Sequence, residues 1–157
     1  MKKVQEELRI FGGQKDFLDE EDLQKCIYLN AVIKETFRLY PVPLLMPKET
    51  NEKSWENPQK FYPERFLESS IDVKGQDFEL IPFGAGRRIC PGMHMGLAAL
   101  ELILGNLLYS FDWELPEGVK NEDVDIESLP GLAPYKKNPL YLIARTKMEL
   151  NNDIYIV

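Results

Sequence analysis

Two stretches near the start of the chain carry apolar residues at the spacing of a helix. The longer one, Tyr28–Leu39, repeats them at intervals of three and four residues: Leu29, Val32, Ile33 and Phe37. This spacing lines up one apolar face, so it predicts an amphipathic helix. Pro41 and Pro43 end that helix, because proline cannot donate the backbone hydrogen bond that a helix interior requires.

Small and acidic residues mark the ends of two further predicted helices. Lys2–Phe11 has the pattern of a helix end, and Gly12 and Gly13 stop it. Farther along, residues 19–22 are all acidic. Acidic side chains suit the first turn of a helix, where the helix dipole favours negative charge. Asp19 is the predicted N-cap of that helix.

The longest apolar stretch runs from Met93 to Phe111. Glu101 and Asn106 interrupt it, and it falls short of the clean apolar run of about 20 residues that spans a bilayer. We therefore predict a buried helix and no membrane segment. Pro139–Ala144 has the composition of a strand. The expected fold class is mainly α with a minor β component.

The middle of the chain, from Pro41 to Ile81, shows neither helical nor strand periodicity. Prolines interrupt it repeatedly: Pro41, Pro43, Pro47, Pro58 and Pro63. Long irregular segments of this kind either carry function or wrap around something else. The C-terminal tail, 147–157, mixes charged and apolar residues and receives no structural assignment.

Composition and charge narrow the function classes. The chain has 157 residues, enough for one domain, and a net charge of −7, which argues against a nucleic-acid partner. It holds two cysteines, Cys26 and Cys90, and one histidine, His94. These cannot build a four-ligand structural zinc site without carboxylates, and they form no disulfide framework. The charged N-terminus has no apolar core, so no signal peptide is predicted.

The most informative segment is the glycine-rich loop 83–92, which ends in Cys90-Pro91-Gly92 and leads into the apolar helix. A cysteine binds metal as the thiolate, and a position at a helix N-terminus favours that anion. We expect Pro91 at the first helical position, where its missing amide costs nothing. Because glycine has no side chain, Gly84, Gly86 and Gly92 let a flat ligand approach the backbone.

These residues also have simpler structural interpretations. A single cysteine is most often a small buried apolar residue, and a glycine-rich loop before a helix is often a phosphate cradle. His94 lies four residues after Cys90 on the same helical face, but we expect it to be a packed or surface residue and not a second ligand. Cys26 has no motif around it and is expected to be structural.

The sequence of the loop favours a metal-binding cysteine over these simpler interpretations. It resembles the haem-binding signature of the cytochrome P450 family, Phe-x-x-Gly-x-Arg-x-Cys-x-Gly. The matching positions are Phe83, Gly86, Arg88, Cys90 and Gly92. The resemblance implies that Cys90 is the thiolate ligand of haem iron and that the other four residues hold the haem. It also implies that Arg88 and Lys48 pair with haem propionates.

Two further segments resemble motifs of the same family, in the family's order. Glu35-Thr36-Phe37-Arg38 looks like its Glu-x-x-Arg motif, and 61–66 looks like its Pro-Glu-Arg-Phe motif. By resemblance, Glu35, Arg38 and Arg65 form a buried charge network that holds the irregular segment before the haem loop. The sequence is most similar to those of plant microsomal members of this family. Residues 42–45 and 129–134 resemble loops that contact substrate.

The resemblance carries expectations for the whole family fold. Residues 1–146 would be the C-terminal, haem-proximal part of that fold, with an internal gap near 50–55, and 147–157 would be a tail. The cofactor would be haem b, with NADPH electrons arriving through a separate flavoprotein reductase that docks on the proximal face. Arg87 is expected to be a solvated surface arginine, and a place on that docking face is the alternative. Substrates would be O2 and a small apolar molecule.

Several parts of the intact family are expected to be missing from this chain. Intact relatives sit on the cytosolic face of the endoplasmic reticulum through an N-terminal anchor, and they carry a distal helix that delivers protons; neither is recognisable here. No residue of this chain is therefore assigned a catalytic role. The alternative is a non-catalytic remnant or interaction module from a truncated gene. A haem-thiolate sensor or a peroxidase-like protein would account for the loop alone.

Overall fold

The computed structural model describes residues 1–41, 54–129, 135–146 and 154–156. Its α-helices are α1 (Lys2–Gly12), α2 (Glu20–Leu23), α3 (Ile27–Leu39) and α4 (Met93–Ser110). Its short 3-10 helices are η1 (Pro63–Phe66), η2 (Gly86–Arg88) and η3 (Asn121–Asp123). Its strands are β1 (Phe111–Glu114), β2 (Ser128–Leu129), β3 (Tyr135–Lys136), β4 (Leu142–Thr146) and β5 (Ile154–Ile156). The predicted fold class, mainly α with minor β, is confirmed.

The helix ends follow the local signals in the sequence. Helix α1 runs one residue past its predicted end, and Gly13 closes it with φ 56°. Asp19 caps α2 as predicted: its carboxylate accepts the amide of Asp22 at 3.0 Å, and the Asp22 carboxylate accepts the amide of Asp19 at 3.3 Å. The Asp22 amide lowers the pKa of Asp19 below its ordinary value. Helix α3 ends at Leu39, two residues before Pro41.

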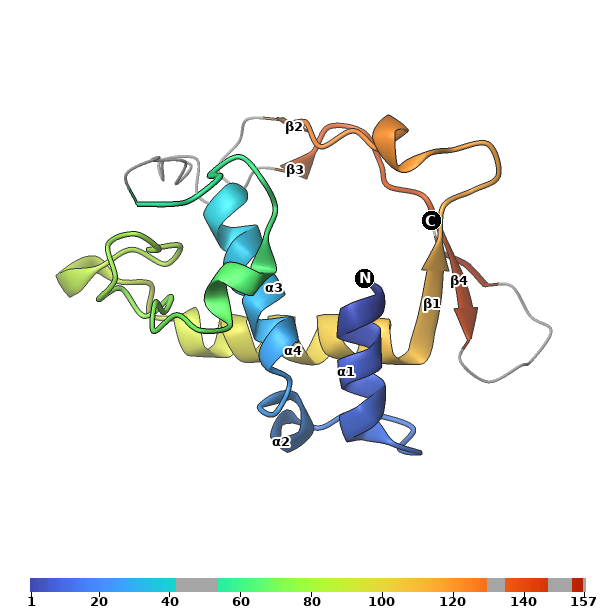
Figure 1. The fold of residues 1–157 in the computed structure, drawn as a ribbon, viewed down its shortest axis with the longest axis horizontal. Helices are drawn as coiled ribbons and strands as arrows, with labels where there is room; N and C mark the ends of the chain where they lie inside the picture. Colours follow the sequence, from blue (N-terminus) through green and yellow to red (C-terminus); the bar gives the residue numbers. More distant parts are fainter. Residues whose placement is uncertain (42–53, 130–134, 147–153, 157) are drawn as a thin grey trace.

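The first hydrophobic core lies where α1, α2 and α3 meet one side of α4 (Figure 1). Its buried residues are Val4, Leu8, Leu18, Leu23, Cys26, Leu29, Ile33 and Tyr109. Full burial of a leucine contributes ~1.5–3 kcal/mol, so this cluster is a main source of stability. Gly105 marks the closest approach, because a Cβ there would lie 2.4 Å from Leu23, and Gly12 is nearly as close, with a Cβ 2.5 Å from Leu18.

The prediction that the apolar segment after Gly92 is a buried helix is wrong for most of α4. Only 22% of its 18 residues are buried, although its length and composition would suffice to cross a membrane. Met95, Ile103 and Leu107 are 77%, 61% and 37% exposed, on the face away from the first core. Helix α4 carries apolar side chains around its circumference, whereas the described helices α1–α3 pack against only one side of it. The remaining side therefore faces solvent in this chain.

A three-stranded antiparallel sheet follows α4, in the order β1-β4-β5 (Figure 1). In its register Phe111 pairs with Thr146 and Glu114 with Ile143. The strand predicted at Pro139–Ala144 is shifted: β4 starts at Leu142, because pairing with β1 extends only to Ile143 and pairing with β5 only to Leu142. Strand β5 pairs with β4 from within the tail, so the sheet continues beyond residue 146. Strands β2 and β3 form a separate antiparallel pair.

The second hydrophobic core lies beneath the irregular segment 54–81, which apart from η1 contains turns and bends, as the prolines predict. Its buried residues are Ala31, Trp55, Phe66, Val73 and Leu80. Residues 42–53, the remainder of the predicted irregular segment, lie outside the described residues. This core joins α3 to the loop that carries Cys90, because Phe83 packs against it.

Candidate functional site

The glycine-rich loop folds back on itself between Phe83 and Cys90. The amide of Cys90 donates a hydrogen bond to the carbonyl oxygen of Phe83 at 2.8 Å, which closes the loop at its base. Gly84 and Gly86 have φ of 77° and 65°, a left-handed conformation that side-chain-bearing residues rarely adopt. These two glycines therefore let the chain reverse direction within the loop, and η2 forms its tip.

The junction between Cys90 and α4 differs from the prediction. Helix α4 begins at Met93 with Gly92 as its N-cap, so Pro91 is not the first helical residue. The amide of Met93 instead donates to the carbonyl of Cys90 at 3.3 Å, closing a four-residue turn. Pro91 occupies the second position of this turn, where its fixed φ is favoured, and Gly92 (φ −90°, ψ 6°) occupies the third. Cys90 thus precedes the helix by three residues.

The sulfur of Cys90 lies on an open surface of the loop. Cys90 is an exposed free cysteine. A Cβ added to Gly92 would lie 3.9 Å from its Sγ, and a Cβ added to Gly86 would meet nothing within 4 Å. The glycines thus leave room on the loop for a flat ligand, in agreement with the haem that the motif implies. The chemistry of the donor also fits, because a thiolate is an established axial ligand of haem iron.

The other predicted site residues take different positions around the sulfur. Phe83 is half-buried and makes an edge-to-face contact with Phe37 of α3, with ring centroids 5.4 Å apart. Arg87 and Arg88 are both exposed, at the tip of the loop. His94, in the first turn of α4, is also exposed. Lys48 and the predicted substrate loop 42–45 lie outside the described residues, as do residues 130–134 of the other.

Two glycines that the sequence reading did not single out also shape this loop. A Cβ on Gly96 would lie 4.0 Å from the Phe83 ring, one turn into α4. A Cβ on Gly75 would lie 2.7 Å from the carbonyl oxygen of Gly84, so Gly75 packs directly against the loop. For Gly96, the four-residue spacing from Gly92 was a signal in the sequence. For Gly75 there was none, because its contact with the loop is tertiary.

The predicted charge network is present. Arg38 Nε lies 2.8 Å from Glu35 Oε2, and Arg65 Nε lies 3.2 Å from the same oxygen. The side chains of Glu35 and Arg38 are fully buried, and that of Arg65 is 8% exposed. Glu35 also accepts the backbone amide of Tyr62 at 2.8 Å. One carboxylate of α3 therefore fixes both an arginine of its own helix and the start of η1.

Cys26 differs from Cys90 in its exposure to solvent. It is fully buried in the first core, and its Sγ donates to the carbonyl oxygen of Asp22 at 3.4 Å. Burial, with smaller contributions from the charges of Glu7 and Asp22, raises the pKa of the Cys26 thiol to about 11. These properties agree with the structural role that the sequence predicts for Cys26.

We expect a thiol reagent at about pH 8 to label Cys90 quickly and Cys26 very slowly in the folded chain. The raised pKa of Cys26 keeps its thiol protonated at that pH, and labelling accelerates only as the pH approaches 11. Peptide mass spectrometry before and after denaturation measures both sites. Similar labelling rates in the folded chain would contradict the assignment.

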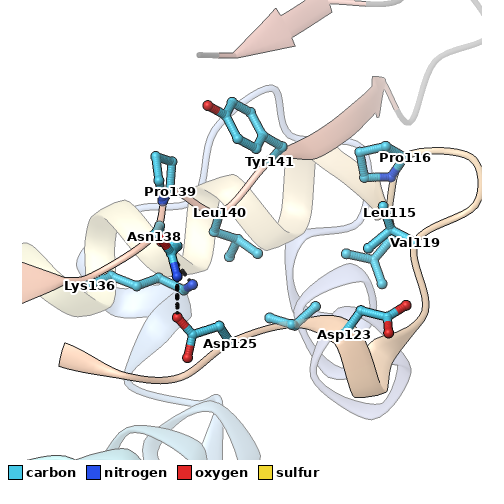
Figure 2. Close-up of a pocket in the computed structure, with 11 residues that line it drawn as sticks. Leu115, Pro116, Val119, Asp123, Asp125, Lys136, Asn138, Pro139, Leu140 and Tyr141 are labelled. Atoms are coloured by element: carbon cyan, nitrogen blue, oxygen red, sulfur yellow. Dashed lines mark hydrogen bonds between the residues drawn. The ribbon is translucent and has the colours of Figure 1, made fainter.

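The hollow shown in Figure 2 lies elsewhere and has a volume of about 440 Å³. Its lining comes from 115–125 and 136–141, beyond the C-terminal end of α4, whereas Cys90 precedes the N-terminal end. Asp125 and Asn138, which line it, are hydrogen-bonded to each other at 2.7 Å. The hollow is thus separate from the thiol loop.

Comparison with known proteins identifies relatives over almost the whole chain. The family model for cytochrome P450 matches residues 1–53 and 47–142. The chain is 48% identical to 5-OH-xanthotoxin synthase of Pastinaca sativa, covering 90% of this chain and 35% of that protein. It is 47% identical to cytochrome P450 71B20 of Arabidopsis thaliana, covering 91% and 34%.

A third relative, 6,7,8-trihydroxycoumarin synthase of Pastinaca sativa, is 47% identical over 90% of this chain and 35% of its own length. The chain therefore spans about a third of the length of the curated relatives it matches. The family match extends through both the charge network and the loop around Cys90. On this evidence the chain belongs to the cytochrome P450 family, a family of haem-dependent monooxygenases.

Proposed function

We propose that Cys90 is the thiolate ligand of a haem b iron and that this chain forms the proximal side of a monooxygenase haem site. The observation that carries the proposal is an exposed cysteine sulfur on a closed, glycine-shaped loop. The same loop carries the family signature, and the family implies haem iron.

The remaining loop residues have supporting roles in this proposal. Gly86 and Gly92 leave space for the porphyrin, as their missing Cβ atoms indicate. Phe83 closes the loop base and shields the sulfur side. Arg88 is exposed and free to turn toward a propionate, whose carboxylate suits a guanidinium. Lys48 would pair with the other propionate.

When bound, the haem would supply oxygen activation, which electron donation from a thiolate ligand favours. The residues of this chain would hold and orient the group. None of them is assigned a catalytic role. In the whole protein we propose insertion of one oxygen atom from O2 into a small apolar substrate. Two relatives are named for hydroxylated products, which supports this reaction class.

Further proposals concern the whole protein. Electrons would come from NADPH through a separate flavoprotein reductase, and the location would be the cytosolic face of the endoplasmic reticulum. Residues 1–146 would be one partial domain with an internal gap near 50–55. Support for the gap comes from the family model, which matches in two segments that meet at 47–53.

The direct test is a haem titration of the purified 157-residue chain. The proposal predicts one haem per chain and, after reduction and addition of CO, the strongly red-shifted Soret band of a thiolate-ligated adduct. A CO adduct with an unshifted Soret band, like that of a histidine-ligated haem, would contradict the thiolate assignment.

The alternative, a non-catalytic remnant or interaction module, is favoured by the exposed apolar face of α4. Soluble monomers rarely expose large continuous apolar areas, and α4 exposes Met95, Ile103 and Leu107. In this reading the chain would associate through α4 whether or not haem is bound.

Substituting Ile103 with aspartate is expected to reduce concentration-dependent self-association of the chain, because it places a charge in the middle of that face. Sedimentation velocity at several concentrations measures the effect. The matched control is Ile10→Asp, since Ile10 is a similarly exposed helical isoleucine (76%) on α1. Equal effects of the two substitutions would rule out a specific role of α4.

A further inference from the structure

Helix α3 begins without a capping side chain from its own segment. Its N-cap, Cys26, makes no side-chain hydrogen bond to the first turn. The first backbone amides of a helix have no partner within the helix, so other groups must accept their hydrogen bonds. The amide of Asn30 already donates to the carbonyl of Cys26 at 3.2 Å. The amides that still need acceptors are those of Ile27, Tyr28 and Leu29.

A glutamate of α1 accepts two of these three amides. The amide of Tyr28 donates to Glu7 Oε1 at 2.8 Å, and the amide of Leu29 donates to Glu7 Oε2 at 3.0 Å. The amide of Ile27 donates to the carbonyl of Lys25 at 3.1 Å, which completes the set. A carboxylate suits this end of a helix because the helix dipole is positive there. Glu7 precedes Tyr28 by 21 residues, so this cap joins two separate helices.

Lys3 makes a second polar contact from the same face of α1, one helical turn before Glu7. Its Nζ lies 2.5 Å from Glu64 Oε1, in η1. The hydroxyl of Tyr28 donates to the same oxygen at 2.9 Å. The hydrogen bond from Lys3 lowers the pKa of Glu64 below its ordinary value, so this carboxylate is charged at neutral pH. We name the set Lys3, Glu7, Tyr28 and Glu64 the α1 bracket, because it joins α1 to α3 and to η1.

The bracket fixes a movement that apolar packing leaves open. Helices α1 and α3 share the first core through Val4 and Leu8 of α1 and through Leu29 and Ile33 of α3. The hydrophobic effect is non-directional, so it holds the helices together but tolerates sliding of one along the other. Hydrogen bonds depend steeply on distance and angle. The two amides bound by Glu7 therefore set the position of α3 along its own axis.

Both elements that the bracket holds lead to the thiol loop. On α3, Phe37 contacts Phe83 edge to face, with ring centroids 5.4 Å apart. The carbonyl of Phe83 accepts the amide of Cys90 and so closes the base of the loop. In η1, the residue after Glu64 is the arginine that joins the buried charge network. A displacement of α3 relative to α1 would therefore move the groups on which the loop base rests.

We propose that Glu7 and Lys3 are positioning residues, which fix α3 and η1 from α1 and thereby hold the base of the Cys90 loop in place for haem. This inference rests on the proposed function of Cys90. It gives α1 a role in the site, although the motifs that define the site begin only at Glu35.

Glu7→Gln is the main test, because it keeps the size of the side chain but removes its charge and one acceptor oxygen. We expect the folded-to-unfolded ratio of the haem-free chain to fall about tenfold, as for the loss of a helix cap. Hydrogen exchange of the Cys90 amide, followed by NMR, reports opening of the loop base and should accelerate several-fold. Haem loss from the loaded 157-residue chain to an acceptor apoprotein should accelerate as well.

Two control variants separate positioning from general stability. Glu6→Gln removes the same charge from the neighbouring, exposed position of α1 and should change neither measurement. Asp19→Ala removes the cap of α2 and should lower the folded-to-unfolded ratio by a factor similar to that of Glu7→Gln. It should leave exchange of the Cys90 amide and haem loss nearly unchanged, because the α1 bracket stays intact.

Lys3→Gln tests the other half of the bracket at a position where the chain is expected to fold. The side chain of Lys3 is 66% exposed, and the loss of an exposed ion pair changes overall stability little. Exchange of the Cys90 amide should still accelerate, by a smaller factor than in Glu7→Gln.

The outcomes separate this inference from the proposed function. Faster exchange of the Cys90 amide and faster haem loss in the two bracket variants, but not in the controls, would support it. If Asp19→Ala changes both rates as much as Glu7→Gln does, the bracket acts only through overall stability and the inference fails. If exchange accelerates but haem loss does not, the bracket does not position the loop for haem, which also overturns it. If the unsubstituted chain forms no thiolate-ligated adduct, the proposed function fails, while the exchange rates still decide whether α1 positions the loop.

Discussion

Replacing Glu35 with glutamine is expected to lower the free energy of unfolding by about 3–5 kcal/mol. The substitution keeps the size of the side chain but removes the carboxylate charge that pairs with both Arg38 and Arg65. Both guanidiniums would then be buried beside a neutral amide. That amide still offers one oxygen, but it no longer compensates two positive charges.

Chemical denaturation of the haem-free chain measures this change. Glu114→Gln is the matched control, because Glu114 also pairs with an arginine, Arg145, at 3.0 Å. The side chains of that pair are 53% and 52% exposed, so its loss should cost less than about 1 kcal/mol. If the two variants lose similar amounts of unfolding free energy, the charge of Glu35 stabilises the chain no more than an exposed ion pair does.

Replacing Cys90 with serine is expected to abolish the red-shifted Soret band of the reduced CO adduct completely. Serine has no readily ionised group and donates electron density to iron far less well than a thiolate. Because Cys90 is exposed, the same change should leave the free energy of unfolding within about 0.5 kcal/mol of the unsubstituted value.

Cys26→Ala is the control and should show the reverse pattern. Cys26 is fully buried, so its truncation is expected to lower the free energy of unfolding by about 1 kcal/mol and to leave the Soret band in place. A red-shifted band that survives Cys90→Ser but is lost in Cys26→Ala would reassign the ligand.

Local sequence signals determined which parts of the fold could be predicted. The cap at Asp19, the end of α3 before Pro41 and the ion pairs of Glu35 all depend on residues close in sequence or on a recognisable motif. Their structures follow from elementary preferences for caps, helix breakers and paired buried charges.

The features that sequence reasoning missed depend on tertiary neighbours. The exposure of α4 depends on which other helices pack against it, and this cannot be predicted from its amino-acid composition. The start of β4 at Leu142 is decided by its pairing with β1 and β5, although the Pro139–Ala144 run suggested otherwise. Pro91 fits a helix start equally well as a turn, and the hydrogen bond from Met93 to Cys90 selects the turn.

The candidate site shows the same division. Phe83, Gly86, Arg88, Cys90 and Gly92 could be selected from the motif alone. Glu7 and Gly75 could not, because their relevance arises from contacts with the first amides of α3 and with the Gly84 carbonyl across the fold.

We have proposed that the sulfur of Cys90 binds haem iron. X-ray absorption at the iron edge of the haem-loaded chain tests it most directly, because sulfur is distinguished from nitrogen and oxygen as a bonded scatterer. One sulfur atom bonded to iron is expected in the unsubstituted chain and none after Cys90→Ser. An iron surrounded by nitrogen and oxygen alone in the unsubstituted chain would contradict it.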